Sequence, residues 1–301
     1  MLKRAATVIQ FAVRSYYHWV MEALGRLLLL GPRLAADPTL QIILPKDGKG
    51  DGFIAQFLAL LPVPLAPTRI LWYNTRDGPN SERVRVGELL YPDWDPVRHM
   101  DSDEPVHCLA PRSVLRMIRE SFSAPNHPST GSKSRPLLVF VTRRGQTMRR
   151  LVNEEALLEA LRQDAGPDFY EIALFDGDSS SVRETIALFS RATVVVGVHG
   201  GALANIVFCG EGATVVELGL RSPATRHYAH AAMALGLQYG LHLVDRTAQG
   251  VASGIVSVGP ATIRTIVAAV RQAMAEQLQH QGEAAMDFPS HPTPVTAHAE
   301  L

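Results

Sequence analysis

The chain has 301 residues, of which 47% are hydrophobic and 19% charged, enough for one large globular domain or two of ordinary size. Its 29 Lys and Arg balance its 29 Asp and Glu, so the basic excess of a nucleic-acid-binding protein is missing. Two cysteines, Cys108 and Cys209, exclude a disulfide framework, and no apolar run reaches the roughly 20 residues that span a bilayer. This composition favours a protein that binds a small molecule through a few charged side chains.

The first half of the chain alternates apolar runs of strand length with helical patterns. The predicted strands are 7–13, 40–44 and 69–73, and the predicted helices are 16–30, 53–61 and 114–122. A loop-rich stretch, 74–107, precedes the last of these helices. The segment 123–136 is polar and rich in Pro, Ser and Gly, which is typical of a linker, so we place the first domain at 1–125.

The second half alternates more regularly. The predicted strands are 137–141, 171–175, 193–198, 214–218 and 240–244, and the predicted helices are 153–161, 181–189, 203–208 and 224–235. Strands that alternate with helices of this length indicate right-handed β-α-β units and a parallel sheet. The sequence therefore predicts an α/β protein with two Rossmann-like, doubly wound domains that face a crevice, the second spanning 136–280.

An amphipathic helix is predicted at 261–278, before the end of the chain. Its apolar stripe consists of Ile263, Ile266, Val267, Val270 and Met274. The segment that follows, 281–301, is rich in Gln, His and Pro, and we expect it to be disordered.

A glycine-rich turn follows the predicted strand 193–198 and leads into a helix. Ligands of open parallel sheets bind beyond the carboxyl ends of the strands, and a helix N-terminus offers free N–H groups and a positive dipole to a diphosphate. The candidate donor-binding residues in this turn are Gly197, His199, Gly200, Gly201, Ala202 and Asn205. Glycines needed only for packing are the alternative. The dinucleotide fingerprint, the Walker lysine and the esterase nucleophile elbow are all missing.

Charged residues follow two other predicted strands. Arg143 and Arg144 end the strand 137–141, and Arg149 lies in the next loop, where guanidinium groups suit phosphate oxygens. A solvated basic loop would have the same pattern. Glu217, near the end of its strand, is a candidate acceptor for two ribose hydroxyls; its alternative role is to partner the dipole of the next helix.

One face of the predicted helix 16–30 carries a candidate catalytic group. His18, Glu22 and Arg26 are spaced four residues apart, so they share that face. A histidine oriented by a carboxylate can act as a general base. A ladder of surface ion pairs on an amphipathic helix is the alternative.

These blocks, in this order, resemble the family-61 glycosyltransferases, a group that includes plant xylosyltransferases and animal enzymes that extend O-linked sugars. The family pattern joins an aromatic-His-Trp segment with an acid and an Arg, a Ser/Thr-Arg-Arg strand end, a later Arg and Asn-Glu, G-x-H-G-A-x-L-x-N-x-x-F, and V-V-E-L. The matching segments are Tyr17-His18-Trp19 with Glu22 and Arg26, Thr142-Arg143-Arg144, Arg149 or Arg150, Asn153-Glu154, Gly197 to Phe208, and Val215 to Leu218.

This sequence departs from the family pattern at two places. Gly201 stands where the family usually has Ala, and Glu184-Thr185 stands where it usually has an acid followed by Gln. The second departure affects contacts with the donor.

The resemblance implies a GT-B architecture and transfer of a sugar from a nucleoside diphosphate, with inversion at the anomeric carbon and without a metal or other cofactor. His18 supported by Glu22 is the expected base, and Arg26 joins the donor-binding set. UDP-linked xylose or N-acetylglucosamine is the expected donor. The acceptor is a glycan or glycoprotein hydroxyl selected by loops in 74–107. Such an enzyme lies in the Golgi or ER lumen in a eukaryote and in the cytoplasm in a bacterium.

Two alternatives to this function stay open. One is a relative that binds a nucleotide sugar without transferring it. The other is a metal-dependent transferase, because Asp-x-Asp pairs that hold a divalent cation occur in such enzymes. The pairs in this chain are Asp93/Asp95, Asp101/Asp103 and Asp176/Asp178, and only the last follows a predicted strand.

Overall fold

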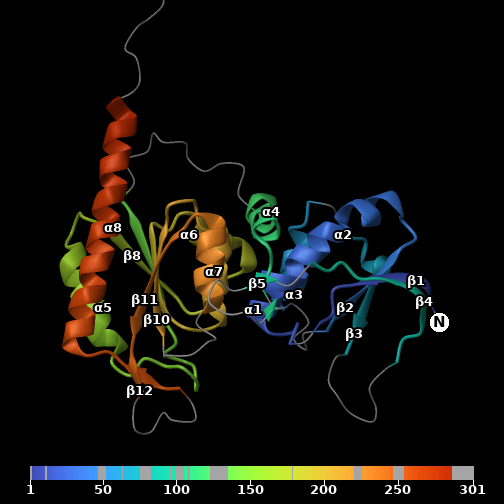
Figure 1. Ribbon diagram of the computed structural model, residues 1–301, viewed down its shortest axis with the longest axis horizontal. Helices are drawn as coiled ribbons and strands as arrows, with labels where there is room; N and C mark the ends of the chain where they lie inside the picture. The colour runs from blue at the N-terminus through green and yellow to red at the C-terminus, as the bar shows by residue number, and fades with distance from the viewer. Residues whose placement is uncertain are drawn as a thin grey trace, which may run out of the picture.

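The computed structural model describes residues 2–10, 12–46, 52–62, 64–74, 83–94, 97–98, 105–106, 109–122, 135–177, 179–219, 226–246 and 254–286. Within these residues, two larger parallel sheets lie beside each other, each with helices packed on it (Figure 1). One sheet is built from the first 90 residues and the other from residues 137 to 243. The predicted α/β class with parallel sheets is confirmed.

The first sheet has the strand order β3-β2-β1-β4, with all neighbours parallel. Its strands are β1 (Leu2–Thr7), β2 (Gln41–Pro45), β3 (Ile70–Tyr73) and β4 (Val86–Leu90). The prediction placed β1 too late, at 7–13, because the buried Val8 and Val13 lie in the loop that follows the strand. It missed β4, an edge strand whose residues are mostly exposed and therefore lack an apolar run.

The second sheet has the strand order β8-β7-β9-β10-β11, again entirely parallel. Its strands are β7 (Leu137–Val141), β8 (Glu171–Phe175), β9 (Val194–Val198), β10 (Thr214–Gly219) and β11 (Gln238–Leu243), within two residues of their predicted positions. Numbered along the chain from β7, this is the doubly wound order 2-1-3-4-5. Its topological switch point, where ligands bind in such sheets, lies between β7 and β9.

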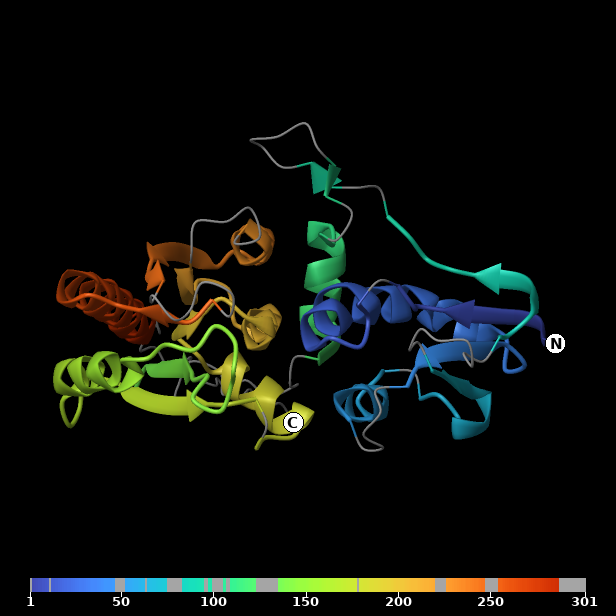
Figure 2. The same cartoon turned by 90° about the horizontal axis from the view of Figure 1, so that it is seen from below.

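Helices cover both faces of the second sheet (Figures 1 and 2). One layer holds α5 (Glu154–Ala165) and α8 (Pro260–Met286); the other holds α6 (Val182–Ser190), the 3₁₀ helix η3 (Gly201–Phe208) and α7 (Arg226–Leu235). Successive side chains of β7 point to opposite faces of the sheet. Leu138 and Phe140 pack under α5 and α8, and Val139 and Val141 pack on the opposite side.

The long helix α8 confirms the predicted apolar stripe but not its predicted end. Ile266, Val270 and Met274 are fully buried against the sheet. The helix continues to Met286, so the expectation of disorder from residue 281 onward was wrong for residues 281–286, whose Ala-, Glu- and Gln-rich sequence is compatible with a helix. The rest of the predicted tail lies outside the described residues. No described helix combines the length and apolarity needed to cross a membrane.

The first half carries its helices in a less regular order. They are α1 (Tyr16–His18), the π-helical turn η1 (Trp19–Ala23), α2 (Leu24–Ala36), α3 (Phe53–Ala59), the short 3₁₀ helix η2 (Pro67–Arg69) and α4 (Arg112–Phe122). Two short antiparallel pairs complete the described structure: β5 (Val97–Arg98) with β6 (Pro105–Val106), and β12 (Asp245–Arg246) with β13 (Val256–Ser257).

The two halves share one hydrophobic core, and α4 lies between them (Figure 2). Phe57 of α3, Phe122 of α4 and Phe208 of η3 pack together with ring centroids 5.6 to 6.3 Å apart. Polar contacts cross the same boundary: the Gln56 side chain accepts a hydrogen bond from the backbone N–H of Val182, 2.7 Å away, at the start of α6. Packing and hydrogen bonds therefore join the two halves that border the cleft described below.

Candidate active site

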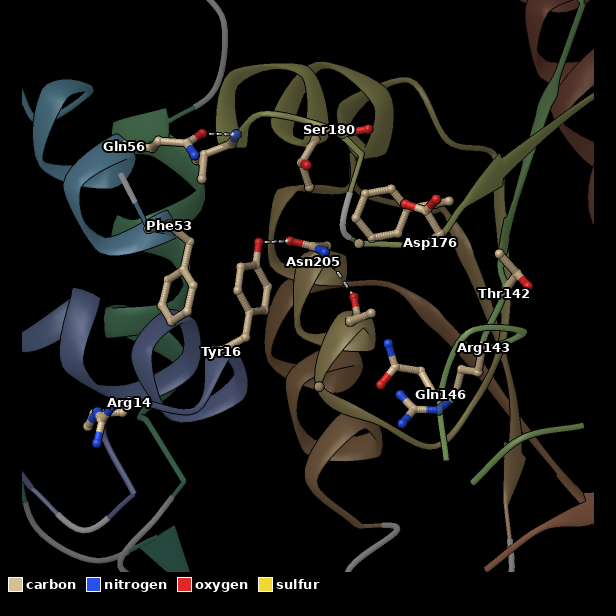
Figure 3. A pocket seen from close by; sticks show the side chains of 17 residues that line it. Arg14, Tyr16, Phe53, Gln56, Thr142, Arg143, Gln146, Asp176, Ser180 and Asn205 are labelled. Carbon is tan, nitrogen blue, oxygen red and sulfur yellow. Dashed lines mark hydrogen bonds between the residues drawn. The ribbon is translucent and has the colours of Figure 1, made fainter. Parts of the chain in front are cut away.

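A cleft of about 530 Å³ lies between the two halves, within the size range of small-molecule sites (Figure 3). Its polar and aromatic lining comes from both halves: Arg14, Tyr16, Phe53 and Gln56 from the first, and Thr142, Arg143, Gln146, Asp176, Ser180, Thr185 and Asn205 from the second. Gly201 and Ala202 border the same space. Of the residues predicted to bind the donor, the structure places Arg143, Gly201, Ala202 and Asn205 along this cleft.

The guanidinium group of Arg143 lies directly against Gly200, at the switch point between β7 and β9. A Cβ atom on Gly200 would collide with the Nη1 and Cζ atoms of this guanidinium group. Arg143 is held there by hydrogen bonds from its Nε and Nη2 to the carbonyl oxygen of Met148, at 3.3 and 3.1 Å. Glycine at position 200 therefore leaves room for the Arg143 guanidinium group next to the backbone.

Two arginines form a positively charged corner without a carboxylate to neutralise it. Burial lowers the pKa of Arg143, and the neighbouring charge of Arg149 lowers it further. Among the described residues, no carboxylate makes an ion pair with either guanidinium group. Arg149 also has a φ of 54°, a left-handed backbone conformation that is uncommon for residues other than glycine. This corner suits an anionic ligand.

Arg144, predicted to bind the donor, has a different position. Its Nε donates to Glu154 at 2.7 Å, and its Nη2 contacts Glu155. The buried Glu154 also accepts hydrogen bonds from the Thr142 hydroxyl and from the backbone N–H of Arg143. Because both carboxylates already satisfy this guanidinium group, Arg144 orders the end of β7 rather than lining the cleft.

His199 and Glu217 form a tightly coupled pair beside the cleft. Nδ1 of His199 is 2.5 Å from Oε1 of Glu217, and the Tyr239 hydroxyl donates to Oε2 at 2.6 Å. Glu217 has no exposed surface. Burial raises the pKa of the Tyr239 phenol, and the charge of Glu217 raises it further. The predicted contact between Glu217 and a ribose does not fit this geometry, because protein groups engage both carboxylate oxygens; Glu217 instead orients His199.

Aromatic rings connect His199 with the predicted base. The Tyr228 hydroxyl donates to the carbonyl oxygen of Gly200 at 2.6 Å, and its ring lies edge-on to His199 at 5.3 Å. Tyr17 lies edge-on to Tyr228 at 5.7 Å and to His18 at 5.1 Å. His18 and His199 thus approach one junction between the two halves from opposite sides.

His18 and Glu22 form the second histidine–carboxylate pair, with Nδ1 and Oε1 2.9 Å apart. Oε2 of Glu22 contacts the amide of Gln10. Glu22 lies in the π-helical turn η1, a feature that is frequent at functional sites. The alternative of a surface ion-pair ladder is wrong, because Glu22 and Arg26 are only 3% and 4% exposed.

Arg26, predicted to bind the donor, is not among the described residues that line the cleft. Its Nη2 donates to Asp93 at 2.9 Å, its Nε donates to the carbonyl oxygen of Pro92 at 3.1 Å, and its guanidinium group stacks on Trp94. Gly197 is also not among the described residues that line the cleft; it is the next-to-last residue of the buried strand β9. A Cβ there would lie 2.8 Å from the Cβ of Val141, so packing explains this glycine.

Sequence reasoning missed several residues of the cleft. The Tyr16 hydroxyl donates to Oδ1 of the fully buried Asn205 at 2.6 Å, and burial raises the pKa of that phenol (Figure 3). Phe53 packs edge-on against Tyr16 at 5.1 Å. The signal available in the sequence for Tyr16 was its position beside the aromatic-His-Trp segment.

The position where the family pattern departs also lies at the cleft. Glu184 forms a capping box with Ser181 at the start of α6, so it has a structural role. Thr185, only 3% exposed, lines the cleft. Thr185, which stands where the family usually has Gln, therefore changes the lining of the cleft. Glu184, by contrast, serves to cap the helix.

Asp176, considered above as a metal ligand, lines the cleft at the carboxyl end of β8. Its Oδ1 accepts hydrogen bonds from the backbone N–H and the hydroxyl of Ser179. Asp178, and with it the Asp-x-Asp pair, lies outside the described residues, as do Asp95, Asp101 and Asp103. No group of three His, Cys, Asp or Glu side chains suited to a metal occurs in the described parts of the chain.

Comparison with known proteins gives a match over most of this region. A sequence model of the family described as Glycosyltransferase 61 matches residues 16–216. The beta-1,2-xylosyltransferase of Arabidopsis thaliana is 26% identical over 193 residues, which cover 60% of this chain and 33% of that protein. The chain thus spans about a third of the length of this curated relative. The matched region contains His18, Glu22, Arg143, His199 and, apart from Arg14, the described residues that line the cleft.

Proposed function

The chain belongs to the Glycosyltransferase 61 family, and we propose that it transfers a sugar from a nucleoside diphosphate sugar to a hydroxyl of a glycan or glycoprotein. The observation that carries this proposal is the position of Arg143, whose guanidinium group lies partly buried against Gly200 at the switch point of a doubly wound sheet. A positive group at that place, facing a cleft between two Rossmann-like halves, suits a diphosphate. The two parallel sheets that flank the cleft also suit a GT-B architecture.

The diphosphate of the donor would lie between Arg143, Arg149 and the start of η3. The first N–H groups of a helix have no partner within the helix, so those of Gly201 and Ala202 are suited to phosphate oxygens. Both residues border the cleft. Uridine is the proposed base, with xylose or N-acetylglucosamine as the proposed sugar.

Asp176 replaces Glu217 as the proposed partner of the ribose. It follows β8, the strand next to β7, which is where an acidic residue binds the ribose hydroxyls in dinucleotide-binding sheets. Asp176 lines the cleft, whereas Glu217 is completely buried. The nucleoside then lies towards Phe53 and Gln56, and the sugar lies towards the junction of His18 and His199.

The proposed reaction is a single displacement with inversion. His18, with Nδ1 held by Glu22, takes the proton of the acceptor hydroxyl on Nε2. The acceptor oxygen forms a bond to the anomeric carbon while the bond from that carbon to the diphosphate breaks, and the nucleoside diphosphate leaves with the electron pair. Arg143 and Arg149 stabilise the charge on the departing diphosphate without a metal ion. The N-terminal end of the helix with His18 adjoins the donor site, because the Tyr17 nitrogen would lie 3.8 Å from a Cβ on Gly201.

Calorimetric titration with UDP in the presence of EDTA tests this proposal. We expect binding without added metal, and a dissociation constant at least about tenfold higher in Arg143→Ala, since a hydrogen bond to a charged group contributes about 1.5–3 kcal/mol. Arg264→Ala, which removes an exposed arginine from α8, is the matched control and should bind UDP like the natural protein. Equal affinity in both variants, or binding that requires Mn²⁺, would contradict the proposed site.

A further inference from the structure

The Arg26 side chain bridges the segment 91–94 and the helix that carries the His18–Glu22 pair. Its guanidinium carbon lies 3.8 Å from the ring centre of Trp94 and 5.4 Å from that of Tyr91. Hydrogen bonds to Pro92 and Asp93, described above, hold the same segment, and Nη1 donates to the carbonyl oxygen of Glu22 at 3.4 Å. Contacts with four successive residues fix the position of this segment relative to the proposed base.

The segment presents an aromatic ring and a carboxylate to solvent. Tyr91 is 37% exposed, and the side chain of Asp93 is 63% exposed. Partial burial raises the pKa of the Tyr91 phenol; the positive charge of Arg26 opposes this shift, and the charges of Asp93 and Glu22 add to it. Tyr91 thus lies within electrostatic reach of Glu22, the residue that holds His18.

We propose that Tyr91 and Asp93 form a binding platform for the acceptor, and that the group bound there is a pyranose ring. This inference rests on the proposed glycosyl transfer. The face of an aromatic ring carries partial negative charge, which attracts the slightly positive C–H groups on one face of a pyranose. A neighbouring carboxylate accepts hydrogen bonds from sugar hydroxyls. An acyl chain matches the ring but not the carboxylate, because an apolar chain beside an ion leaves that ion poorly solvated.

The platform also assigns a role to Arg26. Its side chain is buried, and it is not among the described residues that line the cleft, so it acts as a positioning residue. Arg26 links the acceptor platform to the base through the backbone of Glu22, so that a sugar on Tyr91 and the imidazole of His18 are held in one frame. Orientation of this kind lowers the entropic cost of bringing two reactants together.

Transfer of labelled xylose and N-acetylglucosamine from UDP to xylohexaose and mannohexaose tests the platform. We expect Tyr91→Ala to raise the KM for the accepted oligosaccharide about 2- to 12-fold, the factor that corresponds to the about 0.5–1.5 kcal/mol that an aromatic contact contributes beyond the burial of its area. Tyr91→Phe retains the ring and should restore the KM to within about twofold. The UDP dissociation constant should be the same in all three proteins.

Trp72→Ala is the matched control, because Trp72 is 39% exposed and lies on β3, at the opposite edge of the sheet from β4. Its KM should equal that of the natural protein. An unchanged KM in Tyr91→Ala, an equal rise in Trp72→Ala, or normal UDP binding with neither oligosaccharide accepted would overturn the platform. Failure of the natural protein to bind UDP would overturn the proposed function itself, and with it this inference.

Discussion

Nδ1 of His199 lies 2.5 Å from a carboxylate oxygen of Glu217, and this carboxylate is completely enclosed by protein. Glu217 lies in β10, and His199 directly follows the neighbouring strand β9, which ends at Val198; the backbone N–H of His199 donates to the carbonyl oxygen of Leu218 at 2.9 Å. The short contact and the second hydrogen bond from Tyr239 leave His199 one ring orientation. Hydrogen bonds within the protein thus position the His199 ring next to Gly200, beside the proposed donor site.

Glu217→Gln should lower the rate of sugar transfer in a protein that still folds. The amide keeps the size of the carboxylate but loses its charge and offers only one oxygen to two donors, so the His199 ring is no longer fixed. Misplacement of a group near the reacting atoms by about 1 Å reduces rates by about 100-fold, and we expect a fall in kcat of that order. Tyr239→Phe is the companion variant, because it removes one donor and leaves the His199 contact intact. Equal activity of Glu217→Gln and the natural protein would show that the orientation of His199 is unimportant.

Gly200→Ala should weaken UDP binding, whereas Gly201→Ala should not. A Cβ at residue 200 occupies the space of the Arg143 guanidinium group, while a Cβ at residue 201 finds its nearest neighbour, the Tyr17 nitrogen, at an ordinary 3.8 Å. The φ of Gly200 is 172°, an extended value that alanine also adopts, so the expected effect comes from the displaced arginine alone. Calorimetry with UDP should show a dissociation constant about tenfold higher or more for Gly200→Ala. Comparable affinity in the two variants would contradict the placement of Arg143.

The second half of the fold was largely predictable from the sequence because its strands are buried on both faces. The four valines of 194–198, interrupted only by Gly197, and the run 137–141 give continuous apolar segments with clear limits. The first half is harder to predict. Its edge strand β4 is mostly exposed, and its loops contain buried valines, so apolar periodicity there does not mark the strands.

The candidate site was predicted at the level of motifs rather than of contacts. The spacing of His18 and Glu22 indicates that they meet on one helix, because the distance along a helix is local information. The pairing of His199 with Glu217 depends on the order of the strands in the sheet. The contacts of Arg26 with residues 92–94 depend on a loop almost 70 positions away in the sequence. Arg144 and Arg143 are neighbours in the sequence, yet only the structure shows that Glu154 neutralises one of them.

Cys209 should be inert to alkylation in the folded protein at pH 8. Its thiol is completely buried, and burial raises its pKa to about 12, so the reactive thiolate is practically absent below that pH. The thiol of the unfolded chain ionises near pH 9, so this group disfavours the folded state as the pH rises from about 9 to 12. In a Cys108→Ser variant, which leaves Cys209 as the single thiol, iodoacetamide should label the protein only after denaturant is added. Rapid labelling of the native variant would show that this core opens.

His18→Ala should abolish transfer without weakening the donor site. In the proposed reaction His18 touches only the acceptor hydroxyl, so its removal takes away proton transfer, which contributes about 10²- to 10⁴-fold to a rate. The UDP dissociation constant should stay unchanged, because the groups proposed to hold the diphosphate are Arg143, Arg149 and the start of η3, and His18 is not among them. Glu22→Gln should lose less activity than His18→Ala, since the imidazole remains and only its support changes. Initial rates with labelled UDP-sugar separate these outcomes. Transfer that survives in the His18→Ala Glu22→Ala double variant would assign the base to another residue, and His199, held across the same junction, would then be the first to replace.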